Sequence, residues 1–116
     1  IDKTSRYTGG AILPGLRVSL DSMSSNTAQL PRISLDTPKK VIGKNTVDCM
    51  RSGVIFGNAA MIDGMLSRIE EELGGPATVI ATGGIAKAVL PLCSHTIIYD
   101  GALLLKGLLA LYEKNK

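Results

Sequence analysis

Apolar residues recur every three or four positions through the middle of this chain, which is the period of an amphipathic helix. The pattern runs from Thr46 to about Leu73, and charged residues gather near its far end, at 68–72. The Gly-Gly-Pro at 74–76 is typical of a helix end. The spacing therefore predicts one long helix over 46–73, with Thr46 as its cap.

Shorter segments on either side alternate between strand and helix signals. The run at 78–81 is nearly all apolar, which is typical of a strand covered on both faces. Strands are expected at about 6–13, 32–35, 78–82 and 96–99, and further helices at 14–24, 85–90 and 100–115. The order predicts an α/β fold with a mixed sheet flanked by helices.

The composition excludes several classes of protein. The chain has 116 residues with 45% hydrophobic and 20% charged content, which is ordinary for one globular domain. The net charge of +3, with three Tyr, one Phe and no Trp, offers no stacking surface and argues against a dedicated nucleic-acid binder. The apolar run at 102–111 is interrupted by Lys106 and is too short to span a bilayer, so a cytoplasmic location is expected.

Metal binding and redox chemistry find little support. Cys49 and Cys93 are far apart in sequence and His95 is the only histidine, so no metal site is expected and both thiols are expected to be reduced core residues. The chain begins at Ile1 rather than at a methionine, which favours a piece of a longer protein.

The long helix contains glycines that weaken it locally. Gly53 and Gly57 are four residues apart and therefore share one face, where a second backbone could approach closely. A dimer interface on this face is one interpretation. A break in the helix near these glycines is the alternative.

Glycine pairs and short polar segments are the candidates for ligand binding. Thr82, Gly83 and Gly84 follow a predicted strand, and Gly9 with Gly10 interrupts another, so both pairs could line the edge of a sheet beside a nucleotide. A tight turn is the structural alternative. Neither pair fits the spacing of a phosphate-binding P-loop or of a dinucleotide fingerprint.

The segments Asn26-Thr27 and Asn45-Thr46 present amides and hydroxyls, which suit a polar ligand but not a general base. The helix start at Thr46 would also favour an anion, although most such starts are only caps. Asp48 and Asp63 lie on the predicted helix, where solvated or capping roles are common, and no Ser-His-Asp grouping can be drawn around His95.

Four motifs in order resemble the second half of a type III pantothenate kinase. They are the YTGGAILPGL at 7–16, the TAQLP at 27–31, the IGKNT at 42–46 with Ser52-Gly53, and the ATGG at 81–84. The resemblance covers essentially the whole chain. It implies the superfamily of acetate and sugar kinases, chaperones and actin, so the fold would be one ribonuclease-H-like half of an actin-like ATPase, with its first strand truncated.

The resemblance also implies an activity and a site. Family members phosphorylate pantothenate with ATP and a divalent cation, which commits pantothenate to the synthesis of coenzyme A. They also use a monovalent cation such as potassium or ammonium, and they act as homodimers. By resemblance, Thr46 would contact the substrate across the dimer, Asn26 and Thr27 would line the pocket, and Thr82, Gly83 and Gly84 would contact adenosine. Gly9 and Gly10 match the glycine-glycine strand of the family.

The family's phosphate loops and catalytic aspartate have no counterpart in these residues, so no catalytic residue is assigned and the chain alone is expected to be inactive. Two other functions stay open: an accessory factor of transcriptional activation, and a general actin-like nucleotide-binding module.

Overall fold

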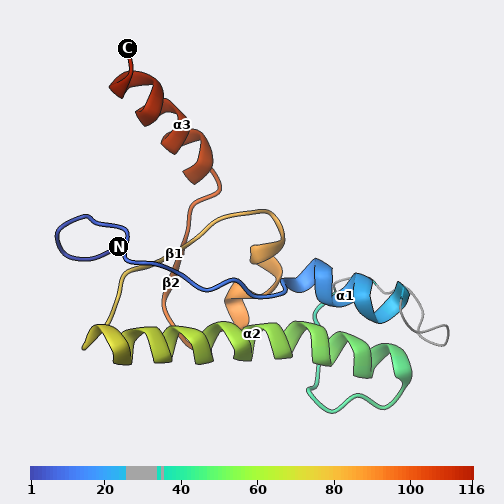
Figure 1. The fold of residues 1–116 in the computed structure, drawn as a ribbon. Helices are drawn as coiled ribbons and strands as arrows, with labels where there is room; N and C mark the ends of the chain where they lie inside the picture. The colour runs from blue at the N-terminus through green and yellow to red at the C-terminus, as the bar shows by residue number, and fades with distance from the viewer. Residues whose placement is uncertain (26–33, 35) are drawn as a thin grey trace.

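The computed structural model describes residues 1–25, 34 and 36–116, and these form a mixed α/β arrangement. Figure 1 shows the longest helix lying along one side of the other elements, with the last helix projecting away from them. In chain order the elements are α1 (Leu16–Ser25), α2 (Thr46–Leu73), β1 (Val79–Ala81), the 3₁₀ helices η1 (Ile85–Ala88) and η2 (Leu90–Leu92), β2 (Ile97–Tyr99) and α3 (Leu103–Lys114). The α/β class predicted from the sequence is confirmed.

Both ends of α2 are closed by side-chain or glycine caps. The Asn45 side-chain oxygen accepts a hydrogen bond from the Asp48 backbone N–H at 2.9 Å, and its amide donates to the Asp48 carboxylate at 2.8 Å. Asn45 is therefore the cap, and the prediction of Thr46 is wrong by one residue, because Asn45 is placed to exchange two bonds with Asp48. At the other end, Gly74 adopts a left-handed conformation with φ 77°.

The helix is continuous over all 28 residues, so the alternative of a break near the glycines is wrong. Burial on one side compensates for the weak helix formers, because α2 carries the fully buried Ile55 and packs against α1 and the segment that contains η2. The buried core cluster is Leu16, Val54, Ala59 and Val89, with Leu20, Met23, Ile62, Ala88, Leu92 and Cys93 packed against it. Cys49 is exposed, so only one of the two free thiols lies at the core.

β1 and β2 form a two-stranded parallel sheet in which Ala81 is opposite Tyr99. Ile80 and Ile98 point to the other face, where their side chains are 52% and 54% exposed. The expectation that the first of these strands is covered on both faces is therefore wrong, since nothing in the described part of the chain covers this side.

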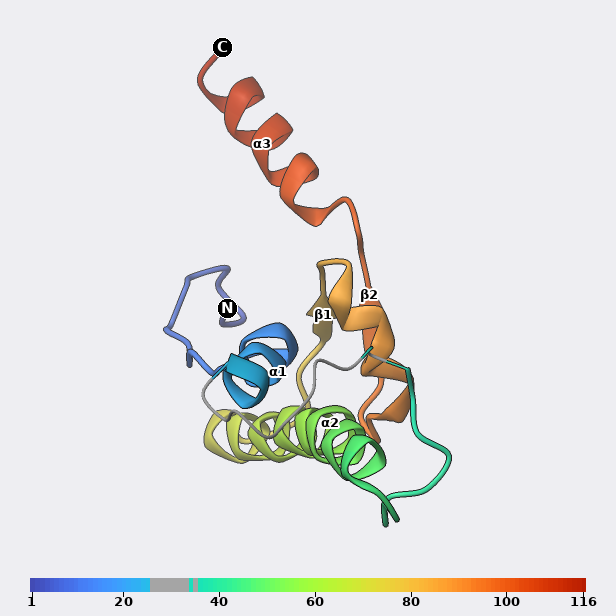
Figure 2. The same cartoon turned by 90° about the vertical axis from the view of Figure 1, so that its right-hand side faces the viewer.

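The predicted strand at 6–13 is also wrong, because these residues form no regular element. A strand needs a partner to hold its backbone hydrogen bonds, and within the described ranges no backbone bond joins residues 7–13 to β1 or β2. Figure 2 shows this segment on the α1 side of the molecule, apart from β1. The predicted strand at 32–35 lies outside the described residues except for Ser34, which is in no strand.

Three predicted helices differ in detail from the observed ones. α1 begins at Leu16, two residues later than predicted. The predicted helix at 85–90 is two short 3₁₀ turns, and Pro91 lies inside the second turn instead of ending the first. α3 starts at Leu103, after a turn in which the Asp100 carboxylate accepts from the Ala102 N–H at 3.0 Å.

α3 has no buried residue along its 12 positions, although most of them are apolar. Leu104 and Leu105 are 72% and 68% exposed. None of the helices that the structure describes is long and apolar enough to cross a lipid bilayer.

Candidate functional site

Thr46 is the first residue of α2 and is exposed. The Asn45 side chain accepts a hydrogen bond from the Asp48 N–H, one of the unpaired backbone N–H groups of the first helical turn, so the Thr46 hydroxyl is not needed as a cap. Among residues 1–25, 34 and 36–116, nothing forms a hydrogen bond with this hydroxyl. It is therefore available to a ligand or to a second chain.

A basic cleft of about 480 Å³ adjoins this helix start. It is lined by Thr37, Pro38, Lys39, Lys40, Ile42, Gly43, Lys44, Asp48 and Arg51. This lining contains four cationic side chains and one carboxylate, that of Asp48. Within the described chain, the only ion pair of Arg51 is with Asp36 at 3.9 Å. The cleft, which we call the basic cleft, therefore favours an anionic group.

Three contacts hold the loop that forms the wall of the basic cleft. The Ser52 hydroxyl donates to the Val41 carbonyl oxygen, and the Arg51 guanidinium donates to the Ser34 hydroxyl at 2.9 Å. Gly43 lies so close to α2 that a Cβ there would be 2.5 Å from the Cys49 backbone nitrogen. Because Gly43 has no side chain, the loop can lie directly against α2, and no larger residue fits at this position.

The second predicted site is the loop Thr82-Gly83-Gly84, which follows β1 directly. Gly83 has φ +99°, a conformation that favours glycine, and Gly84 precedes η1. All three residues are exposed. The Tyr99 hydroxyl, from the end of β2, donates to the Gly83 carbonyl oxygen at 3.0 Å.

The structure does not bring the predicted site residues together. Figure 1 places the start of α2 and the loop after β1 in different parts of the molecule. Gly9 and Gly10 are exposed in the irregular segment before α1, and Asn26 and Thr27 lie outside the described residues. One chain therefore does not build a single pocket from its described site residues.

The Gly53 and Gly57 face of α2 is open in this chain. Both glycines are exposed, and a Cβ built on either would meet no atom within 4 Å. No described helix of the same chain approaches this face, so the close packing predicted there stays a prediction about a second chain.

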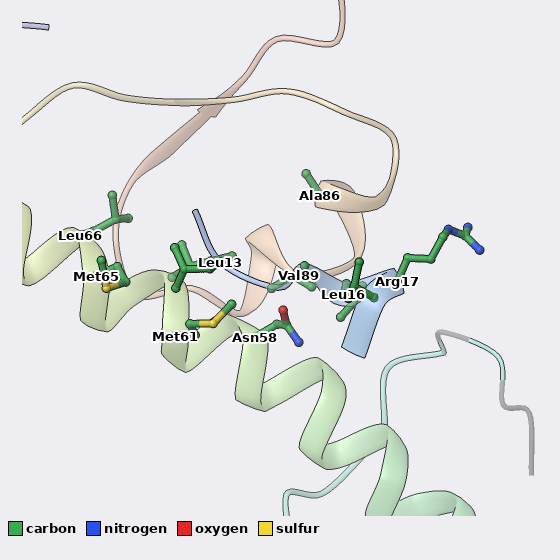
Figure 3. Close-up of a pocket in the computed structure, with 12 residues that line it drawn as sticks. Leu13, Leu16, Arg17, Asn58, Met61, Met65, Leu66, Ala86 and Val89 are labelled. Carbon is green, nitrogen blue, oxygen red and sulfur yellow. The ribbon is translucent and has the colours of Figure 1, made fainter. Parts of the chain in front are cut away.

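An apolar groove of about 510 Å³ lies between the segment at 13–18, α2 and η1 (Figure 3). Met61, Met65 and Leu66 line its floor, and Figure 3 shows Arg17 pointing away from it. Asn58 is its buried polar residue, with the side-chain amide donating to the Val54 carbonyl at 2.6 Å. None of the predicted site residues lines this groove, and its chemistry suits apolar side chains rather than phosphates.

A cluster that the sequence analysis missed surrounds His95. Its Nδ1 lies 2.8 Å from the Asp63 carboxylate and its Nε2 lies 3.4 Å from that of Glu70, and the three side chains are 19–24% exposed. The Asp63 carboxylate also accepts from the backbone N–H groups of Ser94 and His95, and Glu70 accepts from that of Ala77. Asp63 and Glu70 are seven residues apart and so share one face of α2, which is the signal that could have identified this cluster.

The cluster shifts two pKa values in opposite directions. The hydrogen bond that the His95 ring donates to the Asp63 carboxylate, helped by the charge of Glu70, raises the pKa of His95. The backbone N–H of Ser94, together with His95, lowers the pKa of Asp63. Because both ring nitrogens face carboxylates, His95 is placed to hold the turn at 93–96 against α2 and not to act as a free base. No group of three potential metal ligands is found among the described residues.

Comparison with known proteins assigns the chain to a family. The model of the family "Type III pantothenate kinase" matches residues 1–68, which is more than half of the chain. The chain belongs to the type III pantothenate kinase family. The match includes Gly9, Gly10, Thr46, Gly53 and Gly57, which the sequence analysis singled out.

Relatives with the family name are similar over nearly the whole chain. The type III pantothenate kinase of a Thermus thermophilus strain is 46% identical over 112 residues, which are 97% of this chain and 44% of the relative. That of Exiguobacterium sibiricum is 46% identical over 100% of this chain and 46% of the relative, and that of Deinococcus radiodurans is 43% identical over 99% and 44%. The chain thus spans less than half the length of the curated relatives that it matches.

Proposed function

We propose that this chain is the carboxyl-terminal part of an ATP-dependent pantothenate kinase, which transfers the ATP γ-phosphate to the primary alcohol of pantothenate in the first step of coenzyme A biosynthesis. The observation that carries the proposal is the 46% identity to a type III pantothenate kinase over 97% of the chain. The mixed α/β fold is consistent with one ribonuclease-H-like half of an actin-like ATPase.

The proposed pantothenate contact is Thr46, acting on the substrate held by the partner subunit of a homodimer. Two observations support this role. The Thr46 hydroxyl forms no hydrogen bond with the described residues, and Thr46 lies in a different part of the molecule from the loop after β1. Pantothenate carries a carboxylate, and the basic cleft beside Thr46 supplies the complementary charge. Asn26 and Thr27 are proposed to complete this pocket.

The proposed nucleotide contacts are Thr82, Gly83 and Gly84, together with Gly9 and Gly10. The exposed backbone of the loop after β1 supports this assignment, since glycine lets a sugar or base approach closely. ATP would bind with a divalent cation, and the family resemblance adds a monovalent cation whose ligands are not assigned to this chain.

The test compares the full-length parent protein with this chain alone, by measuring ADP release at saturating ATP, magnesium and potassium. We expect pantothenate-dependent turnover from the parent and none from the chain alone, because in-line phosphoryl transfer needs charge-stabilising groups that these residues do not supply. Turnover by the isolated chain would contradict this account. A parent that binds ATP without any effect of pantothenate would favour a general nucleotide-binding module, and a parent without kinase activity would favour an accessory factor.

The proposed homodimer is tested at the open glycine face of α2. In the full-length protein, Gly57→Leu should weaken dimerisation about tenfold or more, because a bulky side chain in a close-packed interface costs about 1–3 kcal/mol. Gly107→Leu in α3 is the matched control, since it is also an exposed helical glycine with open space around its Cβ position. Sedimentation equilibrium that gives equal dimer constants for Gly57→Leu and wild type would exclude this face as the interface.

A further inference from the structure

Tyr99 connects the two strands of the sheet to the loop after β1. It is the last residue of β2 and lies opposite Ala81, the last residue of β1, in the parallel register. The next residue continues this pairing, because the Asp100 N–H donates to the Ala81 carbonyl at 2.9 Å. The backbone of Tyr99 is therefore fixed next to the point where the loop leaves β1.

Two neighbours contact the Tyr99 side chain. The Lys87 ammonium, from η1, stands 5.0 Å from the centre of the ring, within the range of a cation–π contact. A Cβ at Gly101 would come within 3.3 Å of the ring, so the backbone of Gly101 also packs against it. This packing aims the hydroxyl at the Gly83 carbonyl oxygen, 3.0 Å away.

The loop itself needs such support. Gly83 has a positive φ of 99° and three consecutive residues of the loop are exposed, so the backbone there has many alternative conformations to lose when a ligand binds. In the part of the chain that the structure describes, no other side chain donates a hydrogen bond to this loop.

We propose that Tyr99 is a positioning residue for the nucleotide, which acts by fixing the Gly83 carbonyl and with it the Thr82-Gly83-Gly84 loop in the conformation that receives adenosine. This inference rests on the proposed function, which supplies the nucleotide at this loop. Tyr99 itself need not touch the nucleotide. The hydrogen bond from its hydroxyl holds the loop in place before ATP binds, and so lowers the entropy cost of ordering the loop on binding.

The test is Tyr99→Phe in the full-length protein, which removes the hydroxyl and keeps the ring under Lys87. We expect the KM for ATP to rise about fivefold, the size of one neutral hydrogen bond, while kcat and the KM for pantothenate stay within about twofold. Amide hydrogen exchange at residues 83–85 should become faster in the same variant. A purely structural role would instead lower the active fraction and leave the KM for ATP unchanged.

Tyr112→Phe is the matched control, because it removes the same hydroxyl from an exposed residue of α3 and should change neither constant. An unchanged KM for ATP in Tyr99→Phe, with normal turnover in the wild type, would overturn this inference and leave the proposed function intact. A wild-type parent that fails to bind ATP would overturn both, so the two failures are distinguishable.

Discussion

The two glycine pairs of this chain carry the same sequence signal but have different surroundings in the structure. The loop at Gly83 and Gly84 leaves a paired strand and is tied to Tyr99 by a hydrogen bond. The segment at Gly9 and Gly10 belongs to no element and has no backbone hydrogen bond to the sheet among the described residues. Glycine thus permits a backbone conformation, but a neighbour has to select it.

Gly43 is a third case, in which crowding and not a positive φ requires glycine. Its neighbours are backbone atoms of Asp48 and Cys49, which cannot move without disturbing the first turn of α2. The comparison therefore separates glycines that are held by contacts from glycines that are free, and it predicts that the held ones are the more sensitive to an added methyl group.

The largest effect is expected for Gly43→Ala. The added Cβ would lie 2.5 Å from the Cys49 nitrogen and 2.7 Å from the Asp48 carbonyl carbon, so the loop must shift at a cost of about 1–3 kcal/mol in the free energy of unfolding. Urea denaturation of the full-length protein measures this cost. Gly15→Ala is the control, because a Cβ there meets nothing within 4 Å and its effect should stay within about 0.5 kcal/mol.

A smaller effect is expected when two of the positive-φ glycines, Gly83 and Gly9, are compared directly. Alanine at Gly83 or at Gly9 introduces backbone strain of about 1–3 kcal/mol if the native conformation is kept. Gly83 is held by its neighbours, so Gly83→Ala should raise the KM for ATP of the full-length protein about tenfold, the kinetic equivalent of about 1.4 kcal/mol.

Gly9→Ala should raise the same constant by no more than about threefold, because the free segment relaxes and releases most of the strain. Steady-state kinetics with varied ATP gives both values. Equal effects at the two positions would show that Gly9 is held as firmly as Gly83 in the assembled protein, and would remove the distinction drawn above.

Local signals in the sequence were sufficient for α2 and for the two short strands. The helical period and the Gly-Gly-Pro at 74–76 gave the ends of α2 correctly, and 78–82 and 96–99 contain the observed strands. α2 is determined by its local helical period and by a buried face. The two strands have no buried residue and are held by their parallel pairing. The cap was misplaced by one residue because Asn45 and Thr46 are adjacent and both residue types occur as caps, although Asn is the more favoured of the two.

The strand predicted at 6–13 failed for a different reason. Alternation and β-propensity describe a residue's fitness for a sheet, but a strand forms only where a second strand supplies hydrogen bonds. The same limit explains why the hydrogen bond of Tyr99 could not be found from the sequence, and why the shared helix face of Asp63 and Glu70 did not by itself point to His95. The partners of Tyr99 and His95, Gly83 and Asp63, are 16 and 32 residues away, and only the fold brings them together.

The smallest effect concerns the His95 cluster, which anchors the turn before β2 to α2 and so supports the strand that carries Tyr99. Because the pKa of His95 is raised in the folded protein, the charged ring contributes stability that is fully present below its ordinary pKa of 6.5 and is lost as pH rises through the higher folded value. The lowered pKa of Asp63 works in the opposite sense: its contribution is present above its ordinary 3.8 and disappears as pH falls through the folded value. The cluster should therefore stabilise the fold most between these limits, in mildly acidic solution.

We expect the urea midpoint of the full-length protein to exceed that of His95→Gln by more at pH 5.5 than at pH 8.5. Taking the difference between the two proteins at each pH cancels the titration of groups that do not contact His95. The surface exposure of the three side chains keeps the effect small. A difference that is the same at both pH values would mean that His95 holds the turn before β2 as a neutral hydrogen-bonding ring. The charge of the cluster would then have no part in anchoring that turn.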